Sequence, residues 1–127
     1  MTKLKQVYKC EICGNIVEVL HTGVGELVCC NQPMKLIDEN TVDAAQEKHV
    51  PVIEKNGDKV VIRVGSVDHP MDENHFIEWI EIHVGNKIGR KNLKPGELPV
   101  AEFCTVLSDE PIIVRAYCNV HGLWSSK

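Results

Sequence analysis

The 127-residue sequence has few aromatic residues, no long apolar run and no excess of positive charge. Aromatic residues make up 5% of the chain and the formal net charge is −4. This balance argues against a nucleic-acid-binding surface or attachment to an anionic membrane. No stretch approaches the ~20 apolar residues of a membrane-spanning helix. Internal repeats and low-complexity tracts are also missing, so one medium domain, alone or with a small appendage, fits the length.

The first residues, Met1-Thr2-Lys3-Leu4-Lys5, lack the apolar core of a secretion signal. We therefore expect a cytoplasmic protein, in which thiols stay reduced. The cysteines are then expected to be metal ligands or core residues rather than disulfides. There are six of them: Cys10, Cys13, Cys29, Cys30, Cys104 and Cys118.

Two cysteine pairs within residues 1–36 predict a four-thiolate metal site. Cys10 and Cys13 are separated by two residues and followed by Gly14, which permits a tight turn. The adjacent pair Cys29-Cys30 follows fifteen residues later. Four thiolates suit either zinc or iron in a tetrahedral site.

The segment between the two cysteine pairs is expected to form a small hairpin. Residues 16–20 and 26–28 are typical of short strands, and residues 22–25 of the turn that joins them. So small a piece cannot be held together by its own core, which favours a metal ion as the staple. A structural zinc ion is the commoner outcome for such cysteines. The adjacent pair, which distorts a tetrahedron, instead resembles the desulforedoxin type of iron–tetrathiolate centre.

Residues 37–46 are predicted to be a polar linker, with one helical turn near residues 43–47. Short, closely spaced strands with almost no helical periodicity follow, and they favour an all-β, antiparallel sandwich. The expected strands are residues 52–54 and 59–64 around an Asn56-Gly57 hairpin turn, then residues 76–84, 100–107 and 112–118. In residues 76–84 the alternation predicts Ile80, Ile82 and Val84 inside, with Glu81 and His83 outside.

Four histidines lie at predicted strand ends or in loops, where a sandwich carries its binding residues: His49, His69, His75 and His121. Cys118 ends a strand whose apolar positions share one face. Four imidazoles and one thiolate leave one position of an octahedral metal open, which suits a redox iron better than zinc. His21 and His83 are expected to be exposed, and Cys104 to be a core thiol.

These motifs together resemble desulfoferrodoxin, the two-iron class of superoxide reductase. The resemblance runs from Val7 to Trp124 in family order, with no ligand missing. It is carried by Cys10-x2-Cys13, Cys29-Cys30, Glu47-Lys48-His49-Val50-Pro51, His69-Pro70-Met71, His75 and Cys118-Asn119-Val120-His121-Gly122.

The resemblance implies a desulforedoxin-like domain over residues 1–36, a linker over 37–46 and an immunoglobulin-like catalytic domain over 47–127. It also implies a homodimer with two iron ions per chain. One iron is held by Cys10, Cys13, Cys29 and Cys30. The other, ferrous and catalytic, has four equatorial histidines and an axial cysteine: His49, His69, His75, His121 and Cys118.

The implied reaction is the one-electron reduction of superoxide to hydrogen peroxide without release of dioxygen, with a rubredoxin-like protein as electron donor. Glu47 is implied to occupy the sixth position of the oxidised iron. Lys48 is implied to attract the anionic substrate. Backbone N–H groups of residues 119–121 are expected to hydrogen-bond to the sulfur of Cys118 and moderate its electron donation.

Two other classes of protein stay open at this point. A cupredoxin-like electron carrier needs two histidines, one cysteine and commonly a methionine soon after the last histidine. Here Gly122-Leu123-Trp124 follows, and there are more histidines than that site uses. The second alternative is a non-enzymatic, zinc-stapled binding module in which the loop histidines are incidental.

Overall fold

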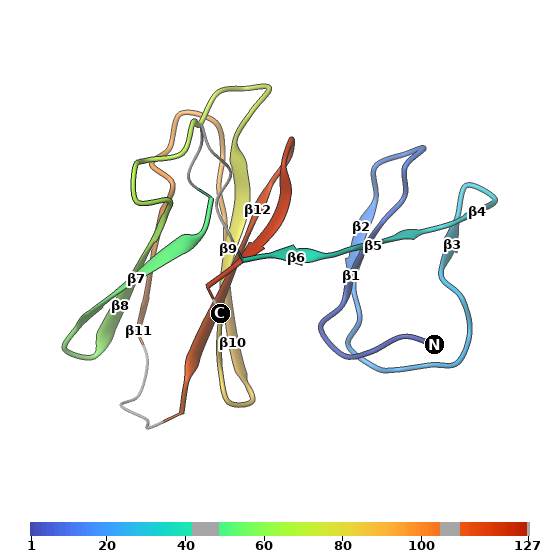
Figure 1. The fold of residues 1–127 in the computed structure, drawn as a ribbon, viewed down its shortest axis with the longest axis horizontal. Coiled ribbons are helices and arrows are strands. Elements are labelled where there is room, and N and C mark those ends of the chain that lie inside the picture. Colours follow the sequence, from blue (N-terminus) through green and yellow to red (C-terminus); the bar gives the residue numbers. More distant parts are fainter. Residues whose placement is uncertain (42–48, 105–109, 127) are drawn as a thin grey trace. The chain divides into compact units, whose positions relative to one another are not determined.

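The computed structural model describes residues 1–41, 49–104 and 110–126, and within these ranges the chain forms strands and no helix. The chain divides into two compact units, Met1–Asp38 and Glu39–Lys127 (Figure 1). None of the described residues belongs to a helix long and apolar enough to cross a membrane. The predicted all-β class is confirmed.

The first unit contains five short strands: β1 (Val7–Lys9), β2 (Ile16–Glu18), β3 (Val28–Cys29), β4 (Gln32–Pro33) and β5 (Lys35–Ile37). One sheet has the order β2-β1-β5, and β3 pairs only with β4. The predicted hairpin between residues 16–20 and 26–28 is therefore wrong.

The cysteine turns themselves form the hairpin loops of the first unit. Lys9 is opposite Ile16, so the Cys10–Cys13 turn lies between β1 and β2. Cys29 is opposite Gln32, so Cys30 and Asn31 join β3 to β4. Both residues have positive φ, 53° and 60°, as a tight two-residue hairpin turn requires. Each cysteine pair thus lies at the turn of its own local hairpin, so β2 pairs with β1 and β3 pairs with β4.

The second unit is a sandwich of two β-sheets whose strands are mostly antiparallel. The larger has the order β10-β9-β12-β13-β6 and the smaller the order β11-β8-β7. The strands are β6 (Glu39–Asn40), β7 (Pro51–Asn56), β8 (Lys59–Val64), β9 (Ile77–Val84), β10 (Lys87–Asn92), β11 (Val100–Cys104), β12 (Ile112–Cys118) and β13 (Gly122–Ser125). The predicted β-sandwich is confirmed.

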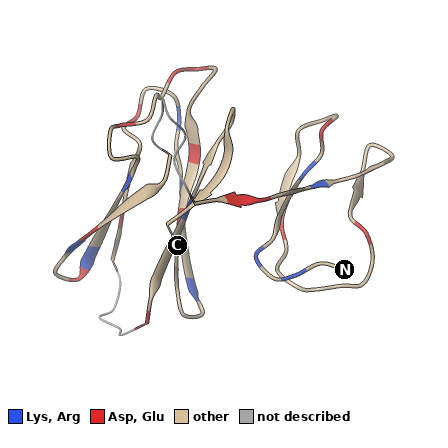
Figure 2. Cartoon of the chain, viewed as in Figure 1, with Lys and Arg blue, Asp and Glu red and all other residues tan. Residues whose placement is uncertain are grey.

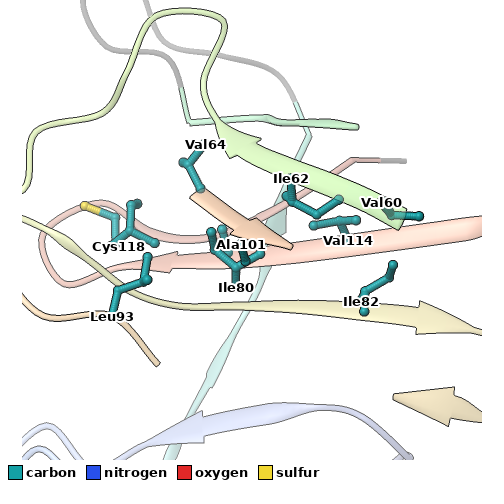
Figure 3. Packing of buried hydrophobic residues seen from close by; sticks show 11 residues of the cluster. Val60, Ile62, Val64, Ile80, Ile82, Leu93, Ala101, Val114 and Cys118 are labelled. Atoms are coloured by element: carbon teal, nitrogen blue, oxygen red, sulfur yellow. The ribbon is translucent and has the colours of Figure 1, made fainter. Parts of the chain in front are cut away.

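Apolar side chains from both sheets fill the space between them (Figure 3). Val60, Ile62 and Val64 on β8 alternate with exposed or half-buried neighbours, and they meet Ile80 and Val114 of the larger sheet. The period of two along each strand thus produces one apolar face per sheet.

The Asn56-Gly57 hairpin between β7 and β8 was predicted correctly, with Gly57 at φ 67°. The strands β9 and β12 also match their predicted ranges closely. Strands β6, β10 and β13 were not predicted. Part of the presumed linker, Glu39–Asn40, pairs in parallel with β13. The helical turn expected near residues 43–47 lies outside the described residues.

The prediction that Glu81 and His83 face solvent is wrong. Glu81 is 0% exposed and His83 is 6% exposed. Arg90 on β10 donates to a Glu81 oxygen at 2.7 Å, and Arg115 on β12 donates to the other oxygen. Figure 2 colours acidic residues red and basic residues blue, and in the strand register Arg90 of β10 lies opposite Glu81 of β9. Strand alternation placed these residues correctly on the face away from the core, but Glu81 has partners on both neighbouring strands, β10 and β12.

Cys104 is exposed rather than a core thiol. On β11 the buried Ala101 and the half-buried Phe103 share one parity and pack on the core side. Cys104 has the opposite parity, so its side chain lies on the outer surface. His21 is exposed, as predicted.

Candidate metal centres

Strand direction gathers the second unit's candidate ligands at one end of the sandwich. His49 precedes β7, while His69 and His75 lie in the connection from β8 to β9. Cys118 ends β12, and His121 lies in the turn to β13. Because neighbouring strands are antiparallel, the starts of β7, β9 and β13 lie beside the ends of β8 and β12 (Figure 1).

The four imidazoles form a closed cycle in which each ring is edge-on to the next. The centroids of successive rings are 4.5 Å apart for His49–His69, 4.9 Å for His69–His75, 5.1 Å for His75–His121 and 5.0 Å for His121–His49. One ligand atom from each ring, together with the sulfur of Cys118, lies within 4.8 Å of all the others. The structure thus brings together all five predicted members of this group.

The members of the group differ in burial. His49, His69 and Cys118 are 1%, 3% and 0% exposed. His75 is half-buried and His121 is exposed. The side of His75 and His121 is therefore the less buried side of the group.

The tautomer of His69 fits metal binding. Its Nδ1 lies 2.8 Å from the carbonyl oxygen of Pro70. A carbonyl only accepts hydrogen bonds, so Nδ1 carries the proton and Nε2 carries the in-plane lone pair. A hydrogen bond of this kind, from the second ring nitrogen to a carbonyl, is what usually orients a metal-bound histidine.

The sulfur of Cys118 accepts the backbone N–H of His121 at 3.4 Å. This is one of the N–H···S contacts expected from residues 119–121. Such a contact withdraws negative charge from a thiolate and tunes the electron density that it gives to a bound metal.

Asn119 ties the turn that carries Cys118 and His121 to the loop that carries His75. Its Oδ1 accepts the backbone N–H of Phe76 at 2.9 Å, and its Nδ2 donates to the carbonyl of Asn74 at 3.1 Å. Its own backbone N–H donates to the Phe76 carbonyl at 3.2 Å. From the sequence, Asn119 was recognisable only as a motif residue, because its partners lie more than forty residues away in the chain.

The first unit brings together the four predicted cysteines Cys10, Cys13, Cys29 and Cys30, with sulfur atoms within 4.8 Å of one another. The sulfurs of Cys13 and Cys29 are 3.6 Å apart, and those of Cys29 and Cys30 are 3.9 Å apart. Gly14 has φ 85°, a conformation that glycine adopts without strain, and this lets the turn close around Cys10.

The four thiols do not ionise alike without a cation among them. Backbone N–H groups of Cys13 and Ile12 lower the pKa of Cys10 to about 6. Hydrogen bonding to the thiols of Cys13 and Cys29 raises the pKa of Cys30 to about 12. A metal ion that binds thiolates removes this conflict, because its charge favours ionisation of every ligand. The donor set therefore fits a tetrathiolate metal site.

Glu47 and Lys48, the other two predicted site residues, lie outside the described residues. The two-histidine set of a cupredoxin does not match the four-imidazole cycle.

An all-β chain with one tetrathiolate group and one four-histidine, one-cysteine group has the architecture of a two-centre non-haem iron protein. The desulfoferrodoxin family model matches residues 41–127, and the model of the desulfoferrodoxin N-terminal domain matches residues 2–37. The chain belongs to the desulfoferrodoxin family, which makes it an oxidoreductase, and its two ligand groups match the family's two iron centres.

Two of the similar proteins span nearly the whole chain, and a third spans part of it. A desulfoferrodoxin from Syntrophotalea carbinolica is 61% identical over 127 residues, covering 100% of this chain and 99% of the relative. The superoxide reductase from Treponema pallidum has a TM-score of 0.79 at 27% identity, with 96% of this chain and 97% of that chain covered. The one-iron superoxide reductase from Giardia intestinalis has a TM-score of 0.57 at 36% identity, with 63% and 95% covered.

Proposed function

We propose that this protein is a superoxide reductase, which converts superoxide to hydrogen peroxide with one electron and two protons and releases no dioxygen. The observation that carries the proposal is the closed cycle of four imidazoles with the Cys118 sulfur, less buried on the side of His75 and His121. An iron(II) ion in this donor set supplies the electron and an open position for a small oxygen ligand.

The chain's own residues divide the work of this centre. His49, His69 and Cys118 are held in the protein interior, so they fix the donor geometry and exclude water from that side. The thiolate of Cys118 raises electron density at the metal, and the N–H of His121 limits that donation. The exposed side, near His75 and His121, is where superoxide approaches and where solvent supplies protons.

Glu47 and Lys48 are assigned supporting roles next to His49. Lys48 attracts the superoxide anion, which a chain of net charge −4 otherwise repels weakly. Glu47 would serve as a ligand of the oxidised iron and would keep other anions out. Oxidised Glu47→Ala protein should then bind cyanide or azide more tightly than the parent. Equal anion affinity in the two proteins would remove this role.

The wider assignment places an iron–tetrathiolate domain at residues 1–36, a linker at 37–46 and the catalytic domain at 47–127. A rubredoxin-like protein is the proposed electron donor, and the assembly a homodimer. We place the protein in the cytoplasm. In that compartment thiols stay reduced, which suits cysteines that serve as metal ligands.

The test of the proposed function combines metal analysis with reaction stoichiometry. Purified protein should contain two irons per chain, whereas a copper carrier would contain one copper and a zinc-stapled module zinc alone. Pre-reduced protein should yield one hydrogen peroxide per superoxide and no dioxygen beyond the spontaneous background. Formation of one dioxygen for every two superoxide ions would identify a dismutase and overturn the proposal.

A further inference from the structure

The indole of Trp124 lies flat against the imidazole of His49. The two ring centroids are 4.5 Å apart and the planes differ by 15°. Both side chains are almost fully buried, at 6% and 1% exposed. We propose that Trp124 is a positioning residue for the iron centre, whose indole face fixes the plane of the His49 ring. The inference rests on the proposed iron centre and adds a residue outside its ligand set.

The plane of the ring matters because the lone pair of an imidazole nitrogen lies in that plane. A rotation about the ring's bond to Cβ, a broad torsion without sharp staggered minima, would swing the lone pair away from a metal. His69 and His121 meet the His49 ring at 62° and 76°, so they touch it edge-on. Trp124 alone among the described neighbours offers a parallel face, and a parallel face resists that rotation.

Trp124 is itself held firmly. It lies on β13 opposite Ala116 of β12 on one side and Asn40 of β6 on the other. The side chain of Asn40 donates to the carbonyl of Leu123 at 3.2 Å, which fixes β13 next to the indole. The short strand β6, in the presumed linker, therefore contributes to the metal centre indirectly: it fixes β13, which carries Trp124, and Trp124 packs on His49.

Trp124 contacts His49 through the face of its indole and not through its N–H. Nε1 of Trp124 is buried and has no hydrogen-bond partner among the described residues. An imidazole that binds a metal cation becomes electron-poor, and the electron-rich face of an indole attracts such a ring. The stack therefore stabilises the metal-bound state of His49 more than the metal-free state, which predicts an effect on metal retention.

A second stack in the same unit provides a matched control. Trp79 on β9 lies against Tyr117 on β12, with centroids 4.6 Å apart and planes 11° apart. These two residues are directly opposite in the register of the larger sheet. The geometry is nearly that of Trp124 and His49, but neither ring is a candidate ligand. Trp79 is half-buried, and its substitution removes a stack that does not touch a candidate ligand.

The experiment measures the rate at which iron(II) passes from the four-histidine centre to a chelator in the full chain. Trp124→Leu removes the flat face, and release should become about 10- to 100-fold faster, as for the loss of other groups that orient metal ligands. Trp124→Phe keeps a flat ring and should stay near the parent rate. The thiolate-to-iron(III) absorption band should shift in Trp124→Leu and not in Trp79→Leu.

The controls separate positioning from general packing. Trp79→Leu should release iron from this centre at the parent rate, and the tetrathiolate centre should be unaffected in every variant. Equal acceleration in Trp79→Leu and Trp124→Leu, or the parent rate in Trp124→Leu, would overturn the inference. If Trp124→Leu does not fold, Trp124→Met fills the space with a flexible chain and replaces it. Iron release is measured without superoxide, so its result is independent of the proposed activity.

Discussion

The two units of the chain are stabilised in different ways. Among the described residues, the first unit buries three apolar side chains, Val7, Cys10 and Val19, whereas the second buries fourteen. Large side chains of the first unit are left in solvent, with Leu20 80% and Val24 88% exposed. Three buried side chains cannot offset the conformational entropy of ordering nearly forty residues.

The candidate ligands also have a different relation to each fold. In the first unit the ligand Cys10 is itself one of the three buried residues, and the cysteine turns close both hairpins. In the second unit only Cys118 belongs to both the core and the ligand group, and the histidines lie beyond the strand ends. We infer that metal holds the fold in the first unit, and that the fold holds metal in the second.

Complete removal of metal should reveal the difference in stability between the two units most clearly. A structural tetrathiolate ion contributes on the order of 10 kcal/mol to the folding of a small domain, so the first unit should unfold. The packed second unit should stay folded. Amide spectra of the chelated protein, recorded by nuclear magnetic resonance, should show dispersed signals only from the sandwich. Dispersed signals from residues 1–38 in metal-free protein would contradict the inference.

Truncation of a core side chain in the second unit should cost a few kcal/mol more stability than truncation of an exposed side chain in the first unit. Ile80 is 0% exposed at the centre of the sandwich. Ile80→Ala should lower the free energy of unfolding of the second unit by about 2–5 kcal/mol, through lost burial and a cavity. Val17→Ala, at a 40% exposed position of the first unit, should change stability by no more than about 0.5 kcal/mol. Denaturant titrations that follow Trp fluorescence and tetrathiolate absorption separately provide the measurement.

Acid should weaken the second unit through Glu81. Burial raises the pKa of this carboxyl, but the nearby His83 ring, the positive charge of Arg115 and the hydrogen bonds from Arg90 and Arg115 outweigh burial and lower the pKa from 4.5 to about 2. A lowered pKa stabilises the folded state above the unfolded pKa, and that stability is lost as pH falls from about 4.5 to about 2.

The shift corresponds to about 3 kcal/mol, because one pKa unit is about 1.4 kcal/mol. Unfolding free energies measured between pH 6 and pH 2 should show this loss in the parent. The Glu81→Gln protein, less stable at neutral pH, should show a smaller dependence on acid. The same pH slope in both proteins would mean that Glu81 titrates alike in folded and unfolded chains.

The cluster of Glu81 with Arg90 and Arg115 could be predicted only in part from the sequence. Alternation along residues 76–84 placed Glu81 on the face away from the core, which is correct. Its burial depends on Arg115 and Arg90, and Arg115 lies 34 residues away in a neighbouring strand. Burial by partners from other strands leaves no periodic signal in a single segment.

The candidate ligands were predictable because each has a residue type and a local context that few other roles require. The Cys10–Cys13 spacing, the adjacent Cys29-Cys30 and the strand-end histidines all reappear in the two groups. The pairing of β1 with β2 was not predictable in this way, because short strands have little pattern of their own. The strand β13 was not predicted because it begins within the motif that carries His121. The proposed role of Trp124 was not predictable because it depends on a contact with His49, 75 positions earlier.

The two units should also differ in how charge affects the reaction, because attraction of superoxide by Lys48 would involve the second unit alone. One unit charge about 6 Å from bound superoxide is worth roughly 0.7 kcal/mol at the dielectric constant of water and about 3 kcal/mol at an effective value of about 20. Lys48→Ile should therefore slow the bimolecular reaction about 3- to 100-fold. Stopped-flow or pulse-radiolysis rates at several salt concentrations provide the measurement.

The control for Lys48 is Lys48→Arg, which keeps the charge and should recover most of the rate. The rate of the parent should fall with added salt more steeply than that of Lys48→Ile, since salt screens an attraction that only the parent has. A Lys48→Ile protein as fast as the parent at low salt would show that the steering charge lies elsewhere.

The smallest expected effect is the most direct test of whether the two units work separately. Cys13→Ser removes one of the four clustered thiolates, so the tetrathiolate absorption should disappear and the first unit should lose its fold. The second unit keeps its own core, its five-member ligand group and the proposed open side near His121. Pre-reduced Cys13→Ser protein should therefore consume superoxide within about 2-fold of the parent rate, since changes this small correspond to less than about 0.5 kcal/mol. Iron content measured on the same sample shows whether the second centre is filled. A large loss of rate with that centre still filled would mean that the first unit takes part in the reaction, and the division between a metal-held unit and a metal-holding unit would then describe their folding but not their function.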